Sequence, residues 1–224
     1  MELSYLVRRV PTPTPAGIGL DGPLWRQADQ LGISHFHPSG SDHRPRTQVR
    51  LLHDAASLFV RFDVDDRYVI SRATHYQDMV CLDSCVEFFF RPKRRLGYFN
   101  VEINCGGTLL WYYIEDPRRT ETGFVKFTPV SAEDARQVTI DHSMPAVVFP
   151  ERTEPTHWSI VCRIPLSVLE RYVGPPGARG AWHWDGNFYK CADHSSHPHW
   201  ASWAPLGETL NFHEPRFFRP IFFE

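Results

Sequence analysis

The chain has 224 residues, with 24 basic and 26 acidic side chains and a formal net charge of -2. This balance disfavours a nucleic-acid-binding surface, which needs a basic excess, and no stretch approaches the ~18 apolar residues of a membrane span. The 19 Pro and 14 Gly are spread along the chain and would interrupt long helices. We therefore predict an all-β fold with one or two short helices, forming a single domain over residues 1–224.

The N-terminal part of the chain is expected to be mostly irregular. Residues 11–23 are rich in Pro and Gly, and residues 35–46 are polar. A short helix is predicted between them, over residues 25–31.

A first hairpin is predicted over residues 49–64, where apolar and polar side chains alternate. A turn at residues 54–57 pairs Leu51 with Val60 and Val49 with Phe62. This register gives the hairpin one apolar face, as a half-buried sheet requires.

A second hairpin carries the polar residues of greatest interest. Matching the apolar faces of residues 86–90 and 99–103 pairs Phe90 with Phe99, Phe88 with Val101 and Val86 with Ile103. On the other face, Glu87 then lies opposite Glu102, Phe89 opposite Asn100 and Cys85 opposite Asn104. A slip of one residue would place carboxylates in the core, so the pattern specifies the register well.

The rest of the chain is predicted to continue as strands and loops. The expected elements are a strand over 109–114, a charged loop over 115–123, weaker strands over 124–130 and 136–141, a strand over 157–164, a helix over 165–172, a Gly/Pro turn over 174–180, a strand over 182–192, a His-rich loop over 193–199 and a closing strand over 216–223. The aromatic residues Trp111, Tyr113, Trp182 and Trp184 lie in strand patterns and are expected to pack in the core or on a sheet face.

The five cysteines, at positions 81, 85, 105, 162 and 191, are predicted to be reduced thiols. Their odd number and their strand-like settings do not suggest a disulfide framework. The first nine residues lack the apolar segment of a signal peptide. We therefore expect a cytoplasmic protein if Met1 is native, and a secreted or periplasmic one if a signal has been removed.

Several segments, in this order, resemble the family 9 carbohydrate-binding modules and their DOMON-like relatives. Together they span most of the chain, and their order and spacing carry the resemblance more than any single segment. These segments are Leu20-Asp21-Gly22-x-x-Trp25, the hairpin over 49–66 ending in Asp63-Val64-Asp65-Asp66, Asp83-Ser84-Cys85-Val86-Glu87-Phe88-Phe89, Tyr98-Phe99-Asn100-Val101-Glu102-Ile103-Asn104, Trp158-x-x-x-x-Arg163-Ile164-Pro165, Trp184-x-x-Asn187-Phe188-Tyr189 and Trp203-Ala204-Pro205.

The resemblance implies a β-sandwich that binds a carbohydrate without catalysis. In that family two Trp rings clamp a sugar above polar residues. The polar residues match Glu87 and about Asn100, with Glu102 and Asn104 on the same strand face as Asn100. The ring of the late loop matches Trp203, or alternatively Trp200. Val80 stands where the second ring is expected, and Tyr76 is the nearest replacement.

Other ligands and activities stay open at this stage. Paired carboxylates roughly 5 to 9 Å apart serve glycosidases, so the Glu87/Glu102 pair also fits a glycan-processing enzyme. The oligomeric state is left open as well.

Three metal or cofactor sites are also conceivable from the sequence. The resemblance implies structural calcium, for which Asp63, Asp65 and Asp66 offer oxygen ligands. A second metal site is suggested by Cys191 with the nearby residues His194, His197 and His199. A DOMON-like haem site would use Met79 and a histidine.

Overall fold

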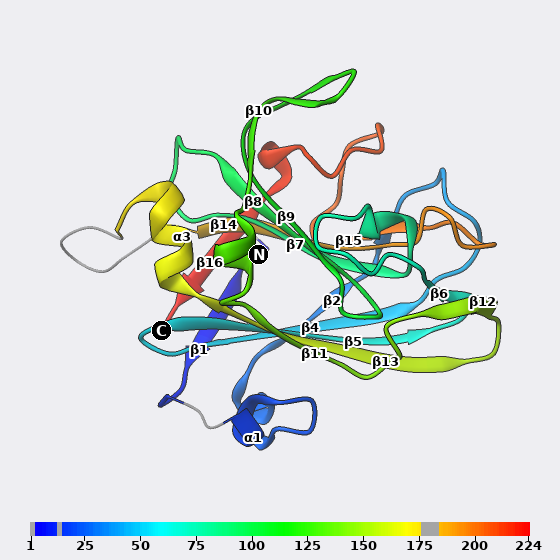
Figure 1. The fold of residues 1–224 in the computed structure, drawn as a ribbon, viewed down its shortest axis with the longest axis horizontal. Coiled ribbons are helices and arrows are strands. Elements are labelled where there is room, and N and C mark those ends of the chain that lie inside the picture. The colour runs from blue at the N-terminus through cyan, green and yellow to red at the C-terminus, as the bar shows by residue number, and fades with distance from the viewer. Residues whose placement is uncertain (1–2, 13–14, 176–183) are drawn as a thin grey trace.

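The structure is a computed structural model of the chain, and it describes residues 3–12, 15–175 and 184–224. Two β-sheets lie one above the other as layers, with the short helix α3 at one end and α1 below the second sheet (Figure 1). The strand order is β10-β9-β8-β7-β14-β16-β1 in the first sheet and β1-β4-β5-β13-β11 in the second. The strand β1 belongs to both sheets, because Tyr5–Val7 pair with β16 while Arg8 and Arg9 pair with β4. The predicted all-β sandwich is confirmed.

The first sheet consists of β10 (Gly123–Pro129), β9 (Leu109–Thr120), β8 (Tyr98–Asn104), β7 (Cys85–Arg91), β14 (Trp184–Cys191), β16 (Arg219–Phe223) and β1 (Tyr5–Arg9), and β15 (Trp200–Ser202) joins β14 to β3 (His35–Phe36). The second contains β4 (Arg46–His53), β5 (Ser57–Asp66), β13 (Thr156–Pro165) and β11 (Thr139–His142), and β2 (Gln30–Ile33) pairs with β4. The strands β6 (Val69–Ser71) and β12 (Val148–Arg152) pair with each other. The helical segments are α1 (Pro15–Ile18), α2 (Ala132–Ala135), α3 (Leu166–Val173), and the 3-10 turns η1 (Pro23–Gln27), η2 (Val80–Leu82) and η3 (Pro215–Phe217).

The predicted register of the first hairpin is confirmed. Leu51 pairs with Val60 and Val49 with Phe62. The turn between β4 and β5 is closed by Asp54, whose carboxylate accepts hydrogen bonds of 2.7 Å from the backbone N–H groups of Ala56 and Ser57. This local bond satisfies two backbone donors in the turn, as Asp side chains in turns commonly do.

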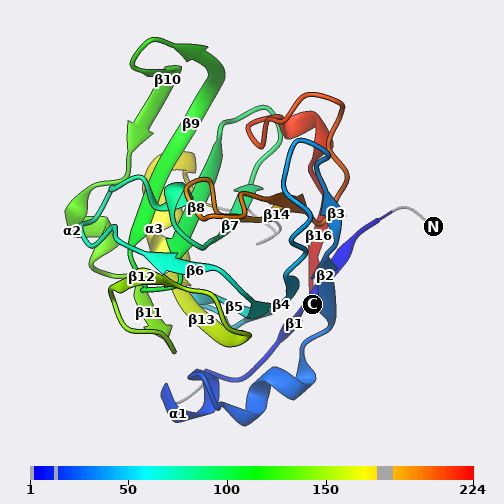
Figure 2. The same cartoon turned by 90° about the vertical axis from the view of Figure 1, so that its right-hand side faces the viewer.

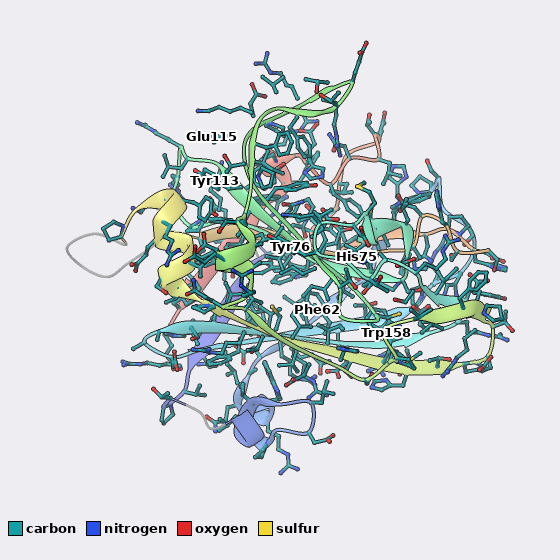
Figure 3. The ribbon with its side chains drawn as sticks, in the orientation of Figure 1. Phe62, His75, Tyr76, Tyr113, Glu115 and Trp158 are labelled. Atoms are coloured by element: carbon teal, nitrogen blue, oxygen red, sulfur yellow. The ribbon has the colours of Figure 1, made fainter. Side chains whose placement is uncertain are left out.

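The second hairpin also has the predicted register, with Glu87 directly opposite Glu102. The apolar side chains of β7 and β8 at positions 86, 88, 90, 99, 101 and 103 point into the space between the sheets. There they meet Phe62 and Trp158 of the second sheet, which Figure 3 labels on the lower side of the core. The two glutamates, one residue out of phase with this core set, consequently face the outer side of the first sheet.

Some predicted elements are wrong in type or length. The proposed helix over 25–31 is a short 3-10 turn, η1, followed by strand β2. The proposed charged loop over 115–123 is strand up to Thr120, because β9 and β10 pair beyond the edge of the sandwich as a projecting hairpin (Figure 1). Charged side chains are tolerated there, since most residues between 115 and 123 are exposed. Trp182 and most of the 174–180 turn lie outside the described residues.

A buried polar network joins the two sheets at one end. The Lys190 ammonium, fully buried, lies 3.4 Å from the Asp66 carboxylate and donates a 2.8 Å hydrogen bond to Nε2 of His199. The Asp66 carboxylate also lies 2.7 Å from Nε2 of His43 and accepts a hydrogen bond from the Trp158 indole. Burial alone would raise the pKa of Asp66, but Lys190 and the hydrogen bond with His43 hold it well below its usual range.

Burial, reinforced by the Lys190 charge, lowers the pKa of His199 to about 3. The folded state thus binds a proton at His199 less readily than the unfolded chain does. The stability that neutral His199 contributes is fully present above the ordinary His pKa of about 6.5. It is lost as the pH falls from there towards 3.

We therefore expect His199→Gln to become acid-tolerant relative to the unmodified protein. Between pH 6.5 and 4.5 the unmodified protein should lose about 2 to 3 kcal/mol more unfolding free energy than the variant, at about 1.4 kcal/mol per pH unit. Urea denaturation at a series of pH values measures this difference. His75→Gln, at an exposed position, is the control, and its unfolding free energy should change with pH as that of the unmodified protein does. If the unfolding free energy of His199→Gln falls with pH as steeply as that of the unmodified protein, His199 does not have this role.

Candidate functional site: a cleft on the outer face of the first sheet

A cleft of about 480 Å³ lies on the outer face of the first sheet, over β7, β8 and β14. We call it the outer-face cleft. It is lined by Met79, Cys81, Glu87, Asn100, Glu102, Leu110, Tyr112, Arg119, Thr122, Gly123, Phe124, Phe127, Cys191, Asp193, Trp200, Leu210, Asn211, Phe212 and His213. Its volume falls in the range of ordinary small-molecule sites.

Two segments far apart in the chain form the sides of the cleft. In Figure 2 the β9–β10 hairpin and the red C-terminal segment before β16 rise on either side of β7, β8 and β14. Besides the floor residues, the lining includes residues of both segments, of the 79–81 segment and of the start of β15. The outer face of this sheet is therefore covered at its sides and open between them.

The floor carries the two predicted carboxyl groups. Glu87 is 2% exposed and Glu102 6% exposed. Glu102 accepts a 2.8 Å hydrogen bond from the side-chain amide of Asn100, whose oxygen accepts one from the backbone N–H of Tyr112. Glu87 accepts a 3.0 Å hydrogen bond from the Cys191 thiol. Among the described residues, neither carboxyl group has a Lys, Arg or His within ion-pair distance.

Burial sets the proton affinity of this floor. It raises the pKa of Glu102 to about 7, although the Asn100 hydrogen bond acts in the opposite direction. Burial, and secondly the neighbouring Glu102, raises the pKa of Glu87 well above its usual range. Burial likewise raises the pKa of Asp193 at the side of the cleft. Two carboxyl groups this close in a low dielectric resist being ionised together, so the pair favours a proton or a bound group that supplies positive charge or donors.

Aromatic rings form the walls above this floor. The indole of Trp200 is held by a 2.7 Å hydrogen bond from its Nε1 to Asp193. Phe212 stacks on Tyr189, with ring centroids 4.2 Å apart. On the other side Tyr112 meets Phe127 edge-to-face at 5.2 Å. The rings of the walls are thus positioned by their own contacts before any ligand enters.

One cation and one histidine complete the lining. The Arg119 guanidinium lies 4.2 Å from the Phe124 ring centroid. His213 bonds through Nδ1 to the Tyr98 hydroxyl at 2.8 Å, and burial lowers the pKa of His213 to about 3. His213 is therefore neutral near pH 7, and Arg119 is the cleft's permanent positive charge among the described residues.

Of the site residues predicted from the sequence, Glu87, Asn100, Glu102 and Trp200 lie together in the cleft. Trp203 does not: it is 5% exposed, belongs to the core between the sheets and packs against Phe188 at 5.7 Å. The reason is the strand β15, which replaces the irregular loop expected there and directs Trp200 and Trp203 to opposite sides.

Tyr76 and Asn104 also lie outside the cleft. Tyr76 packs against the core, where Figure 3 labels it, and its hydroxyl donates to the backbone oxygen of Val130. Asn104 is fully buried; its amide donates to the carboxylate of Asp83 and its oxygen accepts from the backbone of Thr108. Both residues hold backbone segments in place.

The residues proposed for calcium do not fit that ion. Asp63 is paired with Arg50 and Arg61, and Asp66 with Lys190. Asp65 lies beside Arg46 and His157, on the face of β5 opposite to Asp66. Each carboxylate already has a cationic or imidazole partner and the three do not converge, whereas calcium needs several oxygens around one point.

The residues suggested for the Cys/His metal site and for haem do not form such sites either. His197 stacks on Tyr68 and His199 binds Lys190, so the His-rich loop does not converge on Cys191. Met79 is 55% exposed at the mouth of the cleft. The cleft floor beneath it carries buried carboxyl groups, which do not suit the apolar pocket of a haem.

Several of the residues that line the cleft were not predicted from the sequence. For one of them, Tyr112, strand alternation would have indicated its position. Tyr112 lies between the core residues Trp111 and Tyr113, so strand alternation places it on the Glu87 face; it pairs with Asn100. Arg119 and Phe127 lie in the β9–β10 hairpin. The sequence predicted a loop at Arg119 and a weak strand at Phe127. The C-terminal residues Phe212 and His213 come from a segment without periodicity, and only the tertiary structure places them.

The fold and this cleft define a β-sandwich binding domain. A family model described as carbohydrate-binding family 9 matches residues 26–223. Because the match covers most of the chain, this protein belongs to carbohydrate-binding family 9. No curated protein matches the chain.

Three solved structures are similar over nearly the whole chain. A candidate carbohydrate-binding protein from Bacteroides uniformis is 28% identical, with a TM-score of 0.83 and 100% of both chains covered. A family 9 module from Caldicellulosiruptor kristjanssonii in complex with cellotriose is 14% identical, with a TM-score of 0.64, covering 99% of this chain and 94% of that one. The same organism's module in complex with glucose is 13% identical, with a TM-score of 0.62 and coverages of 99% and 96%. The last two show the shared fold.

Two further observations bear on the sequence predictions. All five cysteines are free thiols, as predicted. Within the described ranges, no helix has the length and apolar character needed to cross a membrane.

The two tryptophans of the late segment give a direct test of these positions. Trp203→Ala removes a buried ring and should lower the unfolding free energy by about 3–5 kcal/mol. Trp200→Ala removes a half-exposed ring and should cost clearly less. Urea denaturation of both variants measures the two losses. Equal losses, or a larger one for Trp200→Ala, would show that the core and cleft positions are assigned wrongly.

Proposed function

We propose that the protein binds a carbohydrate in the outer-face cleft and does not catalyse a reaction on it. The observation that carries the proposal is the combination of a floor of buried acceptors with walls of aromatic rings. Sugar hydroxyl groups need hydrogen-bonding partners, and the apolar C–H faces of the ring need flat aromatic surfaces. Membership of carbohydrate-binding family 9 supports the same ligand class.

The floor offers complementary hydrogen-bonding groups. Glu87 and Glu102 each use one oxygen in an internal bond and keep the other for a ligand hydroxyl. The Tyr112 hydroxyl and the Arg119 guanidinium line the cleft without a hydrogen bond to any described residue. They can donate to the ring or glycosidic oxygens of a sugar, and these free donors balance the acceptors of the floor.

Binding without catalysis is supported by where the carboxyl groups lie. In glycosidases the two carboxyl groups flank the scissile bond. Here Glu87 and Glu102 are adjacent on one sheet and 2% and 6% exposed, so both lie beneath a ligand. A ligand in the cleft therefore has both carboxyl groups on one side instead of on the two sides of its glycosidic bond.

The aromatic wall is tested by removing the Trp200 ring. Trp200→Ala should weaken binding of cellotriose or glucose by on the order of 1–3 kcal/mol, because a sugar loses its contact ring. Isothermal titration calorimetry on the purified protein, after a glycan array has selected the best ligand, measures this loss.

The matched control for the wall is Phe149→Ala, an exposed ring on β12 outside the cleft. It should bind as the unmodified protein does. If a sugar binds but Trp200→Ala leaves its affinity unchanged, the site is elsewhere. If no glycan on the array binds, the proposed function itself fails.

The non-catalytic part of the proposal predicts that the protein does not turn over a sugar substrate. Incubation of the protein with cellotriose should release no reducing ends above the buffer rate, and Glu87→Gln should give the same trace. Release that is present in the unmodified protein and lost in Glu87→Gln would establish a hydrolase and overturn the non-catalytic assignment.

A further inference from the structure

Two cysteines and one glutamate converge at the bottom of the outer-face cleft. The Sγ atoms of Cys85 and Cys191 and a carboxylate oxygen of Glu87 all lie within 4.8 Å of one another. Among the described residues, this is the one group of three or more His, Cys, Asp or Glu side chains that converges in this way. Glu87 and Cys191 line the cleft, and Cys85 lies behind them.

The sheet register creates this convergence. Cys191 on β14 lies directly opposite Cys85 on β7. Glu87 follows Cys85 by two residues and therefore points to the same outer face. The side chains at directly opposed and diagonal positions of an antiparallel pair are close enough to share a ligand. The three groups are fixed by two central strands, so little reorganisation is needed to bring them together.

Among the described residues, none of these three side chains has a cationic partner within ion-pair distance that would explain its burial. Cys85 and Cys191 are 0% and 1% exposed, and Glu87 is 2% exposed. The thiol of Cys191 donates to Glu87, and the Glu102 carboxyl group lies directly across the strand pair. Lys190 precedes Cys191 but points to the other face of β14, into the core with Asp66. The site thus gathers potential negative charge without a built-in counter-charge.

We propose that Cys85, Cys191 and Glu87 bind a zinc-type divalent cation below the floor of the cleft. Two sulfur ligands and one carboxylate oxygen form a donor set that suits zinc, and zinc accepts three protein ligands with a fourth position left for water or a ligand. The thiols release their protons to solvent when they coordinate the ion. The open position would face the cleft, the side from which Glu87 and Cys191 are reached.

The donor types separate this proposal from calcium and from sugar binding alone. Calcium prefers oxygen ligands throughout, and sugar hydroxyl groups gain little from thiols. Thiolate sulfur favours softer ions. The inference therefore does not depend on the proposed carbohydrate function, and the two are tested by separate readouts.

The experiment is a metal titration of the purified, fully reduced protein after treatment with a chelator. Zinc should bind with a stoichiometry of one per chain in competition with a chromogenic chelator. Cobalt, used as a spectroscopic probe, should give the thiolate-to-cobalt charge-transfer absorption of a sulfur-ligated site. Zinc should also raise the melting temperature, because it binds the folded protein.

Variants identify the ligands. Cys191→Ser and Glu87→Gln should weaken zinc binding by on the order of 100-fold or more, since loss of even a supporting residue costs 10–100-fold. Cys162→Ala, a buried thiol on β13 in the other sheet, is the control and should bind zinc like the unmodified protein. Circular dichroism checks that each variant is folded. If a cysteine variant does not fold, Glu87→Gln still tests the site, because glutamine keeps the size of the glutamate side chain.

Three outcomes would overturn the proposal: no zinc binding by the reduced protein, zinc binding that survives Glu87→Gln and Cys191→Ser, or loss of binding in Cys162→Ala. A Cys85–Cys191 disulfide in protein purified without reductant, found by peptide mass analysis together with no zinc binding after reduction, would also overturn it. Sugar affinity is measured separately on zinc-free protein, so its failure would count against the proposed function and leave the metal result intact.

Discussion

The pairing of β7 with β8 is the constraint on which the rest of the site depends. Three aromatic or aliphatic side chains on each strand fill the space between the sheets, and no other register keeps them there. Because side chains alternate along a strand, this packing fixes Glu87 opposite Glu102 on the outer face. The hydrophobic core thus determines where two carboxyl groups lie, although neither of them touches it.

What happens to that outer face is decided by other parts of the chain. The β9–β10 hairpin extends past the edge of the sandwich, and the segment before β16 folds back over the same sheet (Figure 2). Together they convert a polar sheet face into a cleft. The carboxyl groups lose water as a result, and their pKa values rise because a low-dielectric surrounding penalises charge. A floor with these properties is suited to recognise hydroxyl groups or a cation.

The strand β14 serves both faces of the sheet. Lys190 points inward and completes the buried network with Asp66 and His199, while Cys191 points outward to Glu87. The inward network balances its charges with close partners, whereas the outward group has no cationic partner among the described residues. This contrast between two consecutive residues is the basis of the metal site proposed at Cys191.

The local sequence pattern was sufficient to predict the register of the two hairpins, but it did not predict the residues that form the walls of the cleft. The sequence by itself determined the alternation of Val86, Phe88 and Phe90 and hence the Glu87/Glu102 pair, because strand periodicity and core packing act over a few residues. It also contained the position of Tyr112, between two core aromatics.

Only the tertiary structure decided which tryptophan borders the cleft. Trp200 and Trp203 lie in similar local sequence, and the short strand β15 separates them. The pairing of Cys85 with Cys191 joins residues far apart in the chain, and so does the gathering of Tyr112 and Phe212 around one cleft. Such contacts depend on how whole strands are ordered in the sheet, which no local periodicity encodes.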